Sequence, residues 1–114
     1  AAASADGHTV SARCGWGGAR LGGGGRAARR GVSSPKGRPG QMMGAAVAFE
    51  AFICARVVQT GCIPPTINRR HPDPELTLDY VPNTARQTDS RVALSNSMGL
   101  GGHNSTLILG RVEA

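Results

Sequence analysis

An acidic side chain inside an apolar stretch is the first feature of this sequence that could do chemistry. Glu50 stands within QMMGAAVAFEAFICARVV (41–58), where nearly every other side chain is apolar. A carboxylate in such surroundings costs several kcal/mol of desolvation unless a cation or strong donors meet it. The nearest cations in sequence are Arg56 in the same stretch and Lys36 and Arg38 in the preceding loop. We expect a Lys36–Glu50 pair that fixes the loop; the alternative is a solvated Glu50–Arg56 pair.

A glycine-rich connection, GLGGHN (99–104), is the second candidate for chemistry. Its backbone N–H groups could form an oxyanion hole, because glycines let amides point at a developing charge without side-chain obstruction. His103 within it is a candidate general base, although a lone loop histidine is more often solvated, and the same applies to His8 and His71. A simple hairpin turn is the alternative reading of this connection.

The cysteines predict neither a metal site nor a disulfide framework. Cys14, Cys54 and Cys62 show no CxxC or Cys/His spacing that would build a tetrahedral site, so we expect no metal centre. Free thiols in a reducing compartment are the simplest interpretation. The chain opens without Met, and no apolar region of a secretory signal follows, whereas an organellar transit peptide or a truncated start would fit the first residues.

The stretch that carries Glu50 predicts an 18-residue helix over 41–58, with Pro39 and Gly40 marking its start. This helix would be apolar on nearly every face, so it must be buried all round in a larger core or in lipid. We do not expect a membrane span, because charged residues interrupt the run and it is short of the ~20 residues that a bilayer needs. The helix therefore predicts more protein around it than 114 residues supply.

The remaining segments complete an α/β fold. Residues 61–68 should be extended because Pro64 and Pro65 restrict the backbone, and residues 71–90 should be surface loop, with one helical turn able to start at Asp73-Pro74-Glu75. Residues 91–97 and 105–112 predict two strands joined by 98–104. We expect one buried helix against two or three strands of a small mixed sheet, with the Pro-rich loop outside.

The N-terminal segment differs in character from the rest. Residues 1–31 are rich in Gly and Arg and have no apolar period, so we expect a disordered leader there and a folded unit over 32–114. The formal net charge of +6 arises entirely within residues 1–40, where seven bases face one acid. Basic Gly/Arg tracts can bind single-stranded nucleic acid, but only Trp16 is available for stacking, so nucleic acid is not the expected partner.

Five stretches together resemble a known family: VSSPKG, GQMMGAAVAFEA, GCIPPTIN, HPDPELTLDYVPNTAR and VALSNSMGLGGHNSTL. In this order and spacing they are similar to the C-terminal part of a β-ketoacyl-acyl-carrier-protein synthase of the elongating type II, a condensing enzyme with a thiolase-like fold. The resemblance runs from about Val32 to Val112. It implies a C-terminal fragment of a condensing enzyme.

The family resemblance implies a decarboxylative Claisen condensation, in which the carbanion derived from malonyl-carrier protein attacks an acyl chain held on a cysteine. Lys36 falls on the lysine that supports the catalytic histidines of the family, and Glu50 falls on its glutamate partner. The oxyanion and gating loop falls on Met98, Gly99, Leu100, Gly101 and Gly102. No cofactor is implied; the implied partners are acyl carrier protein and malonyl or acyl thioesters, with a homodimer in the full-length family and no membrane.

The departures from the family pattern bear on activity. Gln41 stands where the family has its second catalytic histidine, and an amide can donate a hydrogen bond but cannot accept a proton as imidazole does. None of the three cysteines lies in text resembling the nucleophile motif, and no segment matches the first catalytic histidine. We therefore expect the chain to be inactive alone. The expected location is a bacterial cytoplasm, with a plastid or mitochondrion as the alternative. The alternatives are a degenerate or frame-shifted gene product and a basic module that binds nucleic acid or carrier protein.

Overall fold

The computed structural model describes residues 3–4, 31–72, 74 and 78–113. Its elements follow one another as β1 (Ala3–Ser4), β2 (Val32–Ser33), the short 3-10 helices η2 (Pro35–Gly37) and η3 (Met43–Ala45), α2 (Ala46–Thr60), β3 (Cys62–Ile63), β4 (Arg86–Gln87), β5 (Val92–Met98) and β6 (Asn104–Gly110).

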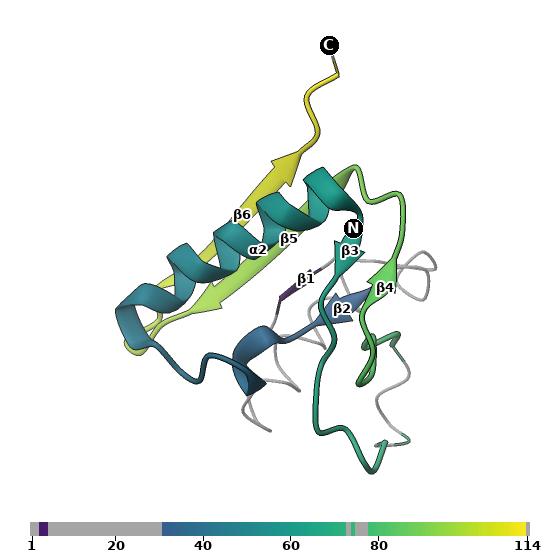
Figure 1. The fold of residues 1–114 in the computed structure, drawn as a ribbon. Coiled ribbons are helices and arrows are strands. Elements are labelled where there is room, and N and C mark those ends of the chain that lie inside the picture. The colour runs from purple at the N-terminus through teal and green to yellow at the C-terminus, as the bar shows by residue number, and fades with distance from the viewer. Residues whose placement is uncertain (1–2, 5–30, 73, 75–77, 114) are drawn as a thin grey trace.

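A mixed four-stranded sheet forms the centre, in the order β2-β1-β5-β6. Strand β1 runs parallel to both β2 and β5, whereas β5 and β6 form an antiparallel hairpin. Helix α2 lies along one face of that hairpin, and β3 and β4 form a separate antiparallel pair beside it (Figure 1). A helix packed on a small mixed sheet confirms the expected α/β fold.

The hairpin lies close to where the sequence predicts it. Its register pairs Val92 with Gly110 at one end and Met98 with Asn104 at the other, so each strand lies within two residues of its predicted position. Ala93 and Ser95 are both buried. Because successive strand residues alternate between faces, these two small side chains share one face of the sheet. Ser95 reaches Glu50 of α2, which identifies this face as the one the helix covers.

The helix begins later than the composition predicts. Residues 41–58 were expected to be helical, but α2 starts at Ala46, after the turn η3. Gly40 and Met43 have φ values of 81° and 49°, which lie in the left-handed region, so a continuous α-helix cannot run through these residues. The C-terminal end is set by Gly61, whose φ of 74° lets its N–H donate to the Val57 carbonyl at 2.8 Å.

Only one side of α2 is buried among the described residues. Glu50, Cys54, Val57 and Val58 point inward, and the last three form the core with Ile63, Val81 and Ala93. The opposite side leaves Phe52 62% exposed, and Met43 of the preceding turn η3 is 72% exposed. The expectation of burial on every side is therefore not met by this chain itself. By length and composition the stretch Met43–Thr60 would also pass as a membrane span, a test that soluble core helices pass as well.

The Pro-rich segment is less peripheral than expected. Tyr80 and Val81 are almost fully buried, and β4 lies within 71–90, so this stretch is not simply a surface loop. The backbone N–H of Val32 donates to the Asp79 carbonyl at 2.8 Å, which fastens the segment to β2. Arg86 donates hydrogen bonds from both terminal nitrogens to the Asp79 carboxylate, and these hydrogen bonds lower the pKa of Asp79.

Two expectations fall mostly outside the described residues. Asp73 and Glu75, where a helical turn was expected, are among the residues that the structure does not describe. The leader 1–31 is described only at Ala3–Ser4 and Gly31; Ala3–Ser4 lie in a strand of the central sheet, and the disorder expected for the rest stays a prediction.

Candidate active site

A buried ion pair joins the loop before α2 to the helix itself. Lys36 Nζ lies 2.9 Å from Oε1 of Glu50, with the side chains 12% and 3% exposed. The other carboxylate oxygen, Oε2, accepts a hydrogen bond from Ser95 Oγ at 3.2 Å. Arg56 instead donates to Gln59 at 2.6 Å on the exposed side of the helix. The structure thus agrees with the Lys36–Glu50 pair and not with the Glu50–Arg56 alternative.

The lysine is held by a short and well-anchored turn. Pro35 opens η2 with its fixed φ, and the N–H of Gly40 donates to the Lys36 carbonyl at 3.0 Å. Gly37 packs closely on Ile67, whose Cγ1 would lie 2.7 Å from a Cβ at that position. The N–H of Ser34 donates to Thr66 Oγ1 at 3.1 Å, so the turn is tied to the Pro-rich segment as well.

A small recess lies beside the ion pair. It is lined by Pro35, Lys36, Pro39, Gly40, Met42, Ala46, Phe49 and Glu50. Its cavity volume is about 10 Å³, close to the roughly 10–15 Å³ that a single water needs, so the recess has no room for a ligand. Gln41 is exposed and is not among the lining residues, so the structure does not bring it into the recess.

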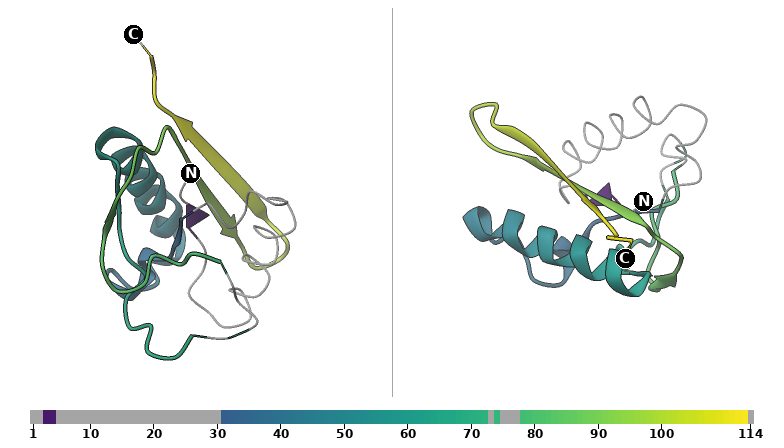
Figure 2. Two further views of the ribbon diagram at one scale, coloured as in Figure 1. Left: turned by 90° about the vertical axis from the view of Figure 1, so that its right-hand side faces the viewer. Right: turned by 90° about the horizontal axis from the view of Figure 1, so that it is seen from above.

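The glycine-rich loop closes the hairpin as a compact turn. Gly99 N–H donates to the His103 carbonyl at 2.7 Å, so this amide is already engaged. Gly101 and Gly102 have φ values of 86° and 84°, which only glycine adopts readily, and Leu100 between Gly99 and Gly101 is 95% exposed. The amides of Leu100, Gly101 and Gly102 remain as candidates for an oxyanion hole. The turn lies at the same end of the fold as the start of α2 (Figures 1 and 2).

The cysteines and histidines form no second centre among the described residues. Burial, and secondarily the charge of Glu50, raises the pKa of Cys54 from 9.0 to about 11, so its thiol is protonated and a poor nucleophile near neutral pH. Cys62, His71 and His103 are exposed, and the described part of the chain holds no cluster of metal-binding side chains. Cys14 and His8 lie outside the described residues.

Ser95 is the contact that sequence reasoning missed. A serine in a strand of alternating pattern carries no signal of its own, because small polar residues occur on both faces of a sheet. Its place in the fold reveals that it faces the helix and not solvent. Ser95 pairs with Leu107 of β6 and lies two residues from buried Ala93, on the same face of β5.

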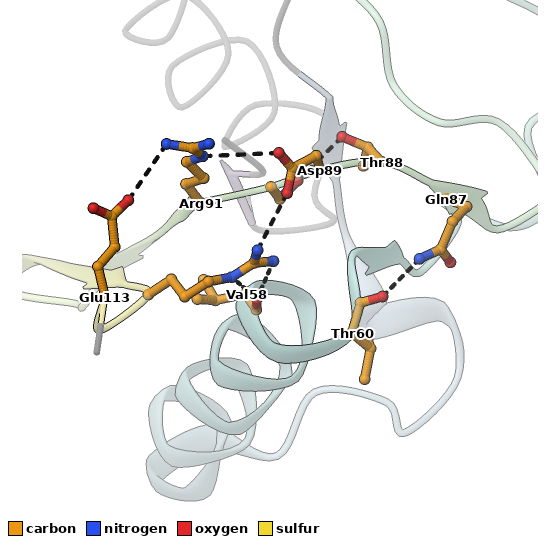
Figure 3. A network of polar contacts seen from close by, with 9 residues as sticks. Val58, Thr60, Gln87, Thr88, Asp89, Arg91 and Glu113 are labelled. Atoms are coloured by element: carbon orange, nitrogen blue, oxygen red, sulfur yellow. Dashed lines mark hydrogen bonds and ion pairs between the residues drawn. The ribbon is translucent and has the colours of Figure 1, made fainter.

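Arg111 was also missed, and it holds the far end of α2. Its guanidinium donates to the Val58 carbonyl from Nε at 3.3 Å and from Nη2 at 3.0 Å, and it pairs with Asp89 at 3.3 Å (Figure 3). Gln87 donates to the Thr60 carbonyl at 2.6 Å in the same network. Both contacts satisfy carbonyls that a helix leaves unpaired at its C-terminal end, so they help to orient the helix that carries Glu50.

The fold is similar to part of one class of protein, the thiolase-like ketosynthases. Among solved structures, a ketosynthase in complex with a type II polyketide synthase acyl carrier protein matches 98% of this chain with a TM-score of 0.92 at 27% identity, using 28% of its own length. The ishigamide ketosynthase/chain length factor covers 74% of this chain, with a TM-score of 0.71 and 42% identity.

Similar proteins are also found among curated sequences. The chain is 47% identical over 81 residues to 3-oxoacyl-[acyl-carrier-protein] synthase 2 of Coxiella burnetii and 43% identical over 89 residues to Nodulation protein E of Rhizobium sp. (strain N33). These matches cover 71% and 78% of this chain but only 20% and 22% of the relatives, so the chain spans about a fifth of their length. No family model matches it. The resemblance to part of a β-ketoacyl-acyl-carrier-protein synthase is thereby confirmed.

Proposed function

We propose that this chain supplies one portion of the active site of a β-ketoacyl synthase, which joins an acyl thioester to the carbanion of a decarboxylated malonyl unit on a carrier protein. The observation that carries the proposal is the Lys36–Glu50 pair, which joins two residues that the family resemblance also pairs. The relatives named as 3-oxoacyl-acyl-carrier-protein synthases support the reaction class. The comparisons favour neither a degenerate product nor a basic binding module.

In this proposal Lys36 and Glu50 provide a fixed positive charge. An ammonium whose carboxylate partner is 3% exposed stays in place instead of sampling the rotamers of a free lysine. A preorganised charge of this kind stabilises negative charge that develops in a transition state, because no reorganisation is needed at that moment. The amides of Leu100, Gly101 and Gly102 would serve a developing oxyanion in the same way.

Gln41 limits what this portion can do. Proton transfer by a positioned side chain contributes typically ~10²–10⁴ in rate, and an amide cannot perform it. Cys54 is protonated and buried, so it does not replace the family nucleophile. We therefore propose that the chain does not catalyse condensation without further ketosynthase structure around it.

The partner we propose is an acyl carrier protein with its thioester-bound substrate. One structurally similar ketosynthase is itself described in complex with a type II polyketide synthase acyl carrier protein, and the described fold of our chain matches that ketosynthase closely. Homodimerisation of the complete enzyme is a further proposal that rests on the family resemblance alone.

An assay with malonyl-carrier protein tests the proposal. The chain alone should release no carbon dioxide and form no 3-ketoacyl product. When it is co-expressed with the Coxiella burnetii synthase from which the matching 81 residues are deleted, we expect Q41H to restore more decarboxylation than the unchanged chain. Turnover by the isolated chain, or restored activity that K36M leaves unchanged, would contradict the proposed role.

A further inference from the structure

The carboxylate of Glu50 is held from two sides by two different elements. Lys36, from the turn η2, meets Oε1 at 2.9 Å as an ion pair, and Ser95, from β5, donates to Oε2 at 3.2 Å. Glu50 and Ser95 are 3% and 2% exposed, so water does not compete for either contact. Two distinct donors thus define the orientation of the carboxylate plane.

The Ser95 contact matters because a carboxylate turns easily about its last torsion. That torsion joins sp³ and sp² carbons and has broad minima, so a single ion pair does not fix the plane. A buried carboxylate oxygen without a donor would also carry a desolvation cost. On the helix the neighbouring inward residues, Cys54 and Val57, offer only a weak thiol donor and an apolar group.

Ser95 also connects the pair to the glycine-rich loop. It lies three residues before Met98, where β5 ends and the loop 99–103 begins. A strand is stiff over so short a distance, because the ladder to β6 holds every residue between them. The hairpin, the helix and the lysine-bearing turn therefore meet at one carboxylate.

We propose that Ser95 is a positioning residue for Lys36, which acts by fixing the rotation of Glu50 and which couples the place of the ammonium to the hairpin. The inference rests on the proposed function, in which Lys36 supplies the fixed charge. The structural contacts on which it stands can be tested without catalytic turnover.

The composition of the chain provides an unusually clean probe. Lys36 is the single lysine in 114 residues. Incorporation of [13Cε]lysine therefore gives one side-chain cross-peak in a carbon–proton correlation spectrum, and its position reports on the ion pair. The spectrum of E50Q marks the position expected when the partner carboxylate is lost.

The variants to compare are S95A and, as a matched control, S97A on the same face of the same strand. Ser97 makes no side-chain hydrogen bond in the part of the chain that the structure describes. We expect S95A to move the Lys36 peak toward the E50Q position and S97A to leave it at the wild-type position. If S95A does not fold, S95C keeps the volume with only a weak S–H donor and carries the same expectation.

The outcomes separate the inference from the proposed function. A peak that moves in E50Q but stays at the wild-type position in S95A and S95C would overturn the positioning role and leave the Lys36–Glu50 pair standing. A peak that S97A moves as far as S95A would show a general loss of packing and also overturn it. A peak unmoved by E50Q would remove the ion pair itself, and with it the observation that supports the proposed function.

Discussion

The single lysine of this chain lies against Glu50, the most buried carboxylate in the part of the chain that the structure describes. Every other basic side chain counted in the net charge is an arginine, and the arginines in the described ion pairs are 42% to 69% exposed. Lysine offers a compact charge that fits within a narrow recess, whereas the planar guanidinium needs room for its fork. A lysine at position 36 is therefore consistent with a positive charge that the surrounding residues hold in place.

Loss of charge at Glu50 should destabilise the chain far more than the same change at the surface. In E50Q the Lys36 ammonium would stay largely buried without its counter-charge, and we expect the free energy of unfolding to fall by roughly 3 kcal/mol. E113Q is the matched control, because Glu113 pairs with Arg91 at 3.3 Å in full view of solvent. It should cost less than about 1 kcal/mol in the same urea titration. Equal losses would show that the Lys36–Glu50 pair is not buried.

Cys54 should make the chain less stable in alkali. Its pKa is raised to about 11, so the unfolded thiol ionises near 9.0 while the folded thiol still holds its proton. The stabilisation is complete below pH 9 and is lost as the pH rises toward 11. We expect C54A to show a flatter decline of unfolding free energy over this interval than the wild type. Parallel declines would mean that the thiol is not buried as described.

The sequence predicted the residues of this site better than their contacts. The Lys36–Glu50 pair could be inferred because a buried carboxylate requires a cation, and only a few cations were within reach in sequence. Ser95 and Arg111 could not be inferred, since both contacts depend on how β5 and the C-terminal segment pack on the helix. The position of Gln41 relative to the recess was equally unpredictable, because it depends on two left-handed backbone residues.

At the scale of elements, backbone geometry decides where α2 begins and ends. Apolar composition predicted a helix from residue 41, but propensity does not register that Met43 adopts φ of 49°. The strands of the hairpin were predicted to within two residues, because two short strand-like runs flank a glycine-rich connection. The four-stranded sheet was not, since the parallel contacts of β1 join residues far apart in sequence.

We expect the C-terminal end of α2 to depend on Gly61 for its stability. G61A would place a Cβ against the Thr88 carbonyl oxygen at a φ of 74°, and we expect a loss of roughly 1–3 kcal/mol of unfolding free energy. G44A is the control, because no atom lies within 4 Å of the added Cβ and Gly44 has no positive φ. It should be neutral or slightly stabilising by thermal unfolding. A G61A variant as stable as G44A would contradict the left-handed cap.

At the scale of the whole molecule, the central feature is a helix with two unequal sides. Its inner side carries Glu50 and part of the core, although Val47 near the start of the helix is 46% exposed, and its outer side leaves Phe52 62% exposed. Exposed apolar groups of this size on one element indicate an interaction surface. The relatives are about five times as long as the matching segment, so we infer that further ketosynthase structure covers this side.

Co-purification tests this account most directly. A tagged form of the chain should retain the Coxiella burnetii synthase that lacks the matching 81 residues when both are expressed together. F52E should abolish retention, because it places a charge on the apolar outer side of α2, whereas T84E, which adds the same charge at an exposed polar position away from that helix, should retain the partner. Retention unaffected by F52E, or no retention of a soluble partner by the unchanged chain, would contradict the claim that this chain is one portion of a larger ketosynthase core.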